Sequence, residues 1–181
     1  MLSDNKKEYV KKAPKKITPQ RLKNIALYYL KRFETSTSNL RLVLKRRIDD
    51  YCYYDKDFDK FEAYSWLDNL LDDFVRLKYV DDERFAEIKI RGYLAMGKSV
   101  RYIVGKLREK GIDEDLVMKF LSTQEYDPFV SALKLAQKKK IGPYSVDCDT
   151  RLKRRSKDLA ILIRAGFDYD VCVRVLDMEE C

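Results

Sequence analysis

One short phrase occurs twice in the chain, fifty-five residues apart, and it constrains the fold more than any other feature. Residues 111–117 read GIDEDLV and residues 166–172 read GFDYDVC. In each copy the glycine is suited to follow a helix in the left-handed conformation, where it carries no Cβ penalty. The aspartate two positions later is suited to cap the next helix by accepting a backbone N–H bond. The phrase therefore predicts a helix end, a sharp corner and a new helix, and its repetition predicts stacked helical units.

The duplication reaches back into the preceding helix, because Leu107 and Leu162 each stand four residues before the glycine. Apolar residues recur at helical spacing along the chain, and 6 Gly and 4 Pro among 181 residues are too few for a turn-rich β fold. We therefore predict an all-α protein, an elongated tandem array of three three-helix repeats over residues 18–79, 80–124 and 125–181. Residues 1–17 are polar and non-periodic, which predicts a disordered lysine-rich tail.

Capping and turn residues predict several helix boundaries. The polar run 35–38 is expected to separate the first two helices, and a third helix is predicted over residues 58–77. Asp81 or Asp82 is expected to cap the fourth helix. The apolar stripes that are expected to face the core include Phe33, Phe61 and Leu152.

The formal net charge of +8 is concentrated in two stretches. Residues 1–18 carry six lysines and a net charge of +4, and residues 138–157 carry eight basic residues and a net charge of +6. Localised positive charge of this kind indicates a polyanionic partner. For any one of these cations, a solvated helix face is the competing interpretation.

Catalytic and metal-binding patterns are missing from the sequence. The chain has no histidine, and its four cysteines form no C-x-x-C pair. Residues 49–59 contain five aspartates but lack the glycine and terminal glutamate of a calcium loop. No phosphate-binding glycine loop or nucleophile elbow is present. We therefore expect a protein without catalytic activity, cofactor, metal or small-molecule substrate. We also expect it to be cytoplasmic, since no apolar run has the length of about 20 residues that a membrane span requires.

Several stretches, in this order and at these spacings, resemble the RecX family of recombination regulators. They are YVDDERFA at 79–86, GKSVRYIVGKLREKGI at 97–112, the run TSTSNLRLVL at 35–44, and RAGF at 164–167. The resemblance covers roughly residues 19–178. Two departures occur in the first repeat: Asn39 replaces the family's usual acidic residue, and Ile48 with an acidic loop replaces a glycine after the second helix.

The resemblance implies a monomeric, non-enzymatic modulator of the RecA recombinase. Such a protein binds the RecA–single-stranded-DNA filament and impedes its extension, ATPase and strand exchange, thereby regulating DNA repair, homologous recombination and the SOS response. The basic faces are then candidate contacts to RecA or to single-stranded DNA. These candidates are Arg41, Lys45 and Arg46 in the first repeat, Lys98, Arg101, Lys106 and Arg108 in the second, and Lys138, Lys139, Lys140, Arg151, Lys153, Arg154 and Arg155 in the third.

Two other functions stay open at the level of the sequence. The repeated corner is superficially similar to a helix-turn-helix, which would make the protein a module that reads duplex DNA. A scaffold that binds some other protein is the second alternative, because helical repeats commonly present extended binding surfaces.

Overall fold

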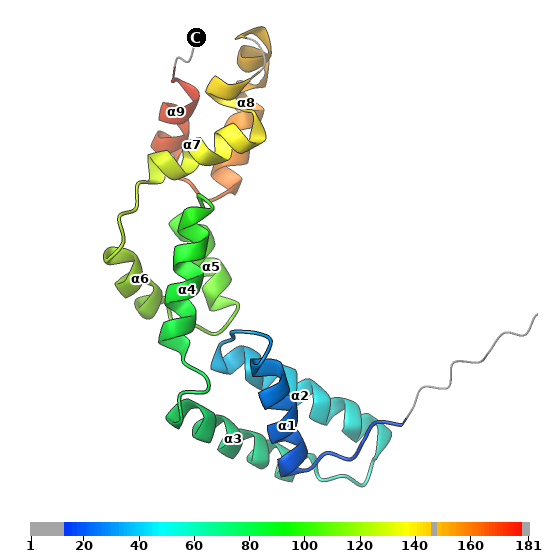
Figure 1. The fold of residues 1–181 in the computed structure, drawn as a ribbon. Helices are drawn as coiled ribbons and strands as arrows, with labels where there is room; N and C mark the ends of the chain where they lie inside the picture. The colour runs from blue at the N-terminus through cyan, green and yellow to red at the C-terminus, as the bar shows by residue number, and fades with distance from the viewer. Residues whose placement is uncertain (1–12, 146–147, 179–181) are drawn as a thin grey trace, which may run out of the picture. The chain divides into compact units, whose positions relative to one another are not determined.

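The structure, a computed structural model, describes residues 13–145 and 148–178, so most of the predicted lysine-rich tail lies outside the described residues. The regular structure in this part of the chain is entirely helical, which confirms the all-α class (Figure 1). Its α-helices are α1 (Pro19–Leu30), α2 (Thr37–Tyr54), α3 (Lys60–Arg76), α4 (Asp82–Ala95), α5 (Val100–Arg108), α6 (Glu114–Ser122), α7 (Pro128–Lys139), α8 (Cys148–Arg164) and α9 (Tyr169–Leu176), with a short 3-10 turn, η1 (Gly142–Tyr144).

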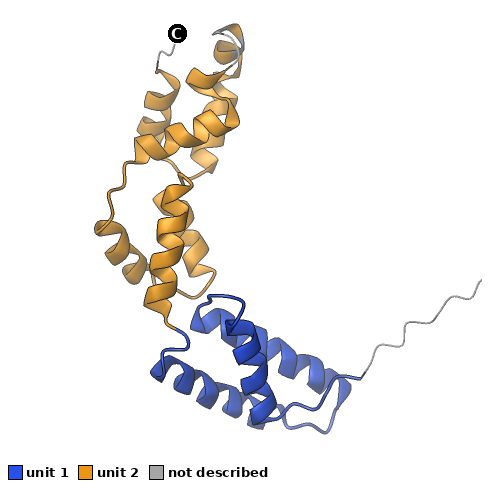
Figure 2. Ribbon diagram, in the orientation of Figure 1, with its two compact units in different colours: residues 1–80 blue, residues 81–181 orange. Residues whose placement is uncertain are grey.

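The chain divides into two compact units, residues 1–80 and residues 81–181 (Figure 2). The first unit has one hydrophobic cluster, built from α1, α2 and α3. The second unit has two clusters, one from α4–α6 and one from α7–α9. The three-repeat boundaries stay a prediction.

In the first unit, buried leucines from all three helices form the centre of the core. Leu22 of α1, Leu40 and Leu44 of α2, and Leu67 and Leu71 of α3 are at most 2% exposed. Ile17, just before α1, joins the same cluster and is 4% exposed. The predicted tail therefore extends too far at its C-terminal end, because its last residue is part of the core.

Three residues that the apolar stripes assigned to the core are exposed. Phe33 follows the end of α1 and is 51% exposed, and Phe61 lies in the first turn of α3, two residues before the buried stripe begins at Ala63. Leu152 is 73% exposed because the inward face of α8 runs through residues 151, 155, 158 and 162, one residue round the helix from it.

The duplicated phrase forms the corner that its sequence predicts. Gly111 and Gly166 have φ values of 71° and 92°, in the left-handed region. The backbone N–H of the next residue, Ile112 or Phe167, donates to the carbonyl of Leu107 at 3.1 Å or of Leu162 at 3.4 Å. The paired leucines thus have a structural role, because their carbonyls close the end of the helix.

The same corner occurs at three further helix ends that the phrase does not mark. In each, a residue with positive φ is followed by one whose N–H donates to the carbonyl five positions earlier, over 2.9–3.1 Å. The positive-φ residues are Lys78, Gly97 and Lys140, with φ values of 58°, 66° and 53°. Lysine therefore occupies a glycine-favouring conformation at two of these corners.

Aspartates precede the helices after three of these corners, those at Lys78, Gly111 and Gly166, but they do not all cap them. Asp81, not Asp82, accepts from the N–H of Arg84 and caps α4. Asp113 accepts from the N–H of Asp115 at 2.8 Å and caps α6, as predicted. Asp168 stands at the same place before α9 but makes no capping hydrogen bond with its side chain, so that part of the prediction is wrong.

A polar cluster joins α2 to α3 beside the aspartate-rich loop. The carboxylate of Asp49 accepts from the Tyr64 hydroxyl at 2.5 Å and from the Lys60 ammonium at 2.8 Å. The ammonium of Lys45 lies 5.5 Å from the centre of the Tyr64 ring. Hydrogen bonds from Lys60 and Tyr64 hold the pKa of Asp49 below its ordinary value of 3.8.

Asp49→Asn is expected to lower the free energy of unfolding at neutral pH. Because the pKa of Asp49 is lower in the folded state, its stabilisation is fully present above about pH 4, the value for the unfolded chain, and is lost as the pH falls through the folded-state pKa. Urea unfolding of wild type and variant between neutral and acid pH measures the difference, which should narrow on acidification. Asp50→Asn, an exposed neighbour, is the matched control, and an equal loss in that variant would contradict the role of Asp49.

Lys140→Gly is expected to raise the free energy of unfolding by up to about 1 kcal/mol, because glycine removes the Cβ penalty of the left-handed conformation while adding some unfolded-state entropy. The control is Lys138→Gly, inside α7, which should destabilise by about 0.5–1 kcal/mol. Chemical denaturation compares the two. Destabilisation by both would show that the lysine corner is not strained.

Candidate functional site

The predicted contact residues of the first repeat lie on α2, and two of them are engaged within the unit. Arg41 forms an ion pair with Asp68 of α3, and Lys45 lies over the ring of Tyr64. Arg46 is exposed and forms no ion pair with another described residue. The contact between α2 and α3 is therefore partly electrostatic at this face. Of the three predicted residues on α2, Arg46 is the most available to a partner.

Two predicted contact residues of the third repeat hold the end of α9. Arg151 donates to the backbone carbonyls of Leu176, at 2.6 Å, and of Met178. Arg155 donates to the Asp177 carboxylate at 2.6 Å, and this hydrogen bond raises the pKa of Arg155. Both arginines fasten α8 to the end of α9, so their side chains are already engaged within the unit.

The remaining predicted contact residues of the third repeat are exposed. None of them forms an ion pair with another residue of the described part of the chain. They are Lys138 and Lys139 at the end of α7, Lys140 in the corner after it, and Lys153 and Arg154 on α8. These five are the predicted contact residues of the basic stretch that stay available to a partner.

In the second repeat the structure separates the four predicted residues into two pairs. Lys98 lies 4.7 Å from the centre of the Tyr102 ring, and Lys106 forms an ion pair with Glu109 at 2.9 Å, which raises the pKa of Lys106. Arg101 and Arg108 stand two turns apart on one face of α5, and both line a single groove. The groove is therefore the place where predicted residues meet.

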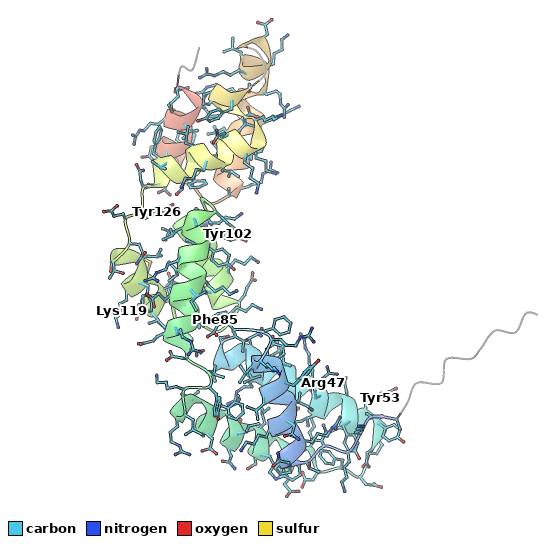
Figure 3. All side chains as sticks on the ribbon, in the orientation of Figure 1. Arg47, Tyr53, Phe85, Tyr102, Lys119 and Tyr126 are labelled. Carbon is cyan, nitrogen blue, oxygen red and sulfur yellow. The ribbon has the colours of Figure 1, made fainter. Side chains whose placement is uncertain are left out.

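This groove, which we call the inter-repeat groove, lies within the second unit and has a volume of about 640 Å³. One wall is the face of α5 with Arg101, Val104 and Arg108. Phe167, in the corner before α9, and Met118 of α6 are apolar residues that also line it. The groove extends to Tyr126, which Figure 3 labels in the segment between α6 and α7.

A buried serine fixes the groove by joining α5 to the corner after α8. The Ser99 hydroxyl donates to the carbonyl of Ala165 at 2.6 Å and accepts from the N–H of Tyr102 at 3.2 Å, so it also caps α5. A Cβ built on Gly166 would lie 2.6 Å from the Ser99 hydroxyl. The second copy of the duplicated phrase therefore needs glycine for close approach as well as for its φ.

The groove carries charges of both signs. Arg108 pairs with Glu114 at 3.0 Å, with both side chains more than half exposed, so the pair is weak and can exchange for a partner's groups. Asp168 also lines the groove, with its carboxylate not used as a helix cap. Burial raises the pKa of Tyr126, against hydrogen bonds from the backbone of Val100 and the side chain of Ser131.

This combination of an apolar floor, two arginines and two carboxylates suits recognition of a polar protein surface. The described residues contain no group of three or more Cys, Asp or Glu side chains placed to hold a metal ion. Of the helices that the structure describes, none is long and apolar enough to cross a membrane.

Sequence reasoning missed several lining residues. The sequence did not predict four residues as part of a site, because the candidate contacts were chosen for positive charge alone. These residues are Met118, Tyr126, Glu114 and Asp168. The one usable signal is the duplicated phrase itself, since its second copy supplies Gly166, Phe167 and Asp168 to the groove.

Comparisons with known proteins agree with one another. A family model described as the second three-helix domain of RecX matches residues 81–121. The regulatory protein RecX of Myxococcus xanthus is 38% identical over 176 residues, which cover 96% of this chain and 94% of that protein. The regulatory protein RecX of Agrobacterium fabrum is 34% identical over 103 residues, 56% of this chain and 54% of the relative.

The fold also has a counterpart among solved structures. The crystal structure of RecX from Lactobacillus salivarius superposes with a TM-score of 0.63, covering 88% of this chain and 96% of the other. The sequence identity of that pair is 21%, so this likeness concerns the fold alone.

Gly166→Ala is expected to lower the free energy of unfolding by at least about 1–2 kcal/mol, because alanine must adopt a positive φ and displace Ser99. Gly92→Ala is the matched control: a Cβ there meets nothing within 4 Å, and alanine in the helix should stabilise by about 0.5–1 kcal/mol. Denaturant unfolding of both variants measures the contrast. Equal stability of the two would refute the close approach at Gly166.

Proposed function

Because the chain belongs to the RecX family of regulatory proteins, we propose that it acts by binding the RecA–single-stranded-DNA filament. In this proposal it inhibits filament extension, ATPase and strand exchange, and so regulates DNA repair in the cytoplasm. It does so as a monomer and a binding protein, without chemistry of its own. The motifs at 79–86 and 97–112 support the choice of RecA as partner through their resemblance to the family.

The observation that carries the proposal is the inter-repeat groove. It joins an apolar floor at Val104 and Phe167 to the guanidinium groups of Arg101 and Arg108. Arginine and buried aromatic groups are the residues that most often anchor protein interfaces. A rim of exchangeable charge, such as the Arg108–Glu114 pair, favours a defined orientation of the partner more than raw affinity.

Nucleic acid is the second component of the proposed target. Lys138, Lys139, Lys153 and Arg154 are exposed and could meet phosphates of the filament's single strand. Such contacts release counterions, so the association should weaken steeply as salt rises.

The two alternative functions receive less support. The helices after the duplicated corners begin with exposed acidic residues, Glu114 and Asp115 in α6 and Asp170 in α9. A recognition helix whose first turn is acidic would be repelled by the phosphates of duplex DNA. A scaffold function, in which the groove binds some other protein, is compatible with the structure, but the family assignment favours a recombination partner.

The test is the ATPase activity of RecA on single-stranded DNA with the protein added at equimolar concentration. The wild type is expected to lower the turnover. The double variant Arg101→Ala/Arg108→Ala should need about tenfold more protein for the same effect, which corresponds to about 1.4 kcal/mol of interface energy.

Arg91→Ala is the matched control, since Arg91 is an exposed arginine of the same unit that pairs with Glu87 and does not line the groove. It should behave as the wild type. Unchanged RecA turnover with wild-type protein would contradict the proposed function, and equal losses in both variants would contradict the role of the groove.

A further inference from the structure

A second groove lies in the first unit, between the segment that precedes α1 and the faces of α1 and α2. Its volume is about 750 Å³, within the range of about 300–1,000 Å³ that is usual for ligand sites. Three cations line it: Lys15, Arg21 of α1 and Arg47 of α2. Figure 3 labels Arg47. Asp50 is the only acidic residue among the described residues that line it, so the lining carries a net positive charge.

These cations are not neutralised inside the unit. Arg47 and Lys15 form no ion pair with any other residue in the described ranges. The Nε atom of Arg21 is buried and has no hydrogen-bond partner among the described atoms. A charged donor without an acceptor is unfavourable, and an anion beside the guanidinium in the groove would offset part of that cost through its charge.

The groove also offers an aromatic surface and two amides. Tyr28 is 64% exposed, and the guanidinium of Arg32 lies 5.6 Å from the centre of its ring. Gln20 donates to Asn24 at 2.9 Å, and both amides line the groove. An exposed ring provides a stacking surface for an unpaired base, and amide side chains can hydrogen-bond to base edges.

We propose that this groove binds a short stretch of single-stranded nucleic acid, with phosphates on Arg21, Arg47 and Lys15 and a base stacked on Tyr28. Arginine's planar fork matches phosphate oxygens. The aromatic surface favours a nucleic acid over an acidic peptide, because a peptide carboxylate uses the cations but leaves the ring unused. A duplex hides the faces of its bases, so the stacking surface favours a single strand.

The proposal deepens the proposed function, since it assigns a nucleic-acid contact to a site that the charge pattern did not select. Its test uses the full chain without any recombinase, so the proposed function and the present inference can fail separately. If the protein binds the single strand through this groove but leaves RecA turnover unchanged, the proposed function fails and the present inference stands.

The probe is a fluorescein-labelled oligothymidylate of about 16 nucleotides, a length at the upper end of common single-strand sites. Binding is followed by fluorescence anisotropy over a series of salt concentrations. Arg47→Ala and Arg21→Gln should each raise the Kd about tenfold and reduce the slope of log K against log salt by about 0.7, since each removes one phosphate contact to a single strand. Tyr28→Ala should raise the Kd without changing the slope, because stacking releases no counterion.

Lys31→Ala is the control, because Lys31 is an exposed cation at the end of α1 that does not line the groove. It should bind as the wild type, and circular dichroism of every variant checks that the helices are retained. The inference is overturned if the wild type does not bind the oligonucleotide, or if the Lys31 variant loses as much affinity as the Arg47 variant. Displacement of the probe by polyglutamate as readily as by unlabelled oligothymidylate would identify an acidic peptide as the ligand, and equal displacement by duplex DNA would exclude selection of a single strand.

Discussion

The fold depends on one way of ending a helix. At five corners a residue with positive φ is followed by a backbone N–H that donates to the carbonyl five positions earlier. This bond uses a carbonyl that the helix leaves unpaired, and it turns the chain within two residues so that another helix can pack against the first. The corner at Gly166 also lets Ser99 reach the carbonyl of Ala165, so the same geometry positions one wall of the inter-repeat groove.

The sequence predicts this corner where glycine occupies it and not where lysine does. Gly111 and Gly166 carry a recognisable phrase, whereas Lys78 and Lys140 look like ordinary surface residues. Nothing local to a lysine signals a left-handed conformation, which the surrounding packing imposes. The same limit explains Asp168: the phrase predicts a capping bond, but the aspartate's position beside the groove is a tertiary property.

The charge pattern of the sequence identifies the basic stretches but does not show what each basic residue does in the fold. Arg151 and Arg155 belong to the most basic segment, yet they bind the end of α9. Arg101 and Gly166 are far apart in the chain and become neighbours only through the packing of α5 on the corner after α8. Helical class and helix order were therefore predictable from the sequence, whereas which residues line the groove required the structure.

The availability of a cation, rather than the number of cations nearby, decides which surface can meet a polyanion. In the inter-repeat groove the arginines face Glu114 and Asp168, so an approaching phosphate would encounter both signs of charge. In the groove of the first unit, Lys15, Arg21 and Arg47 face a single carboxylate among the described lining residues, and Arg21 retains an unpaired buried donor. Mixed charge around an apolar floor favours an oriented protein surface, and unpaired cations beside a tyrosine ring favour a strand of phosphates and bases. The two grooves are therefore suited to different components of one nucleoprotein partner.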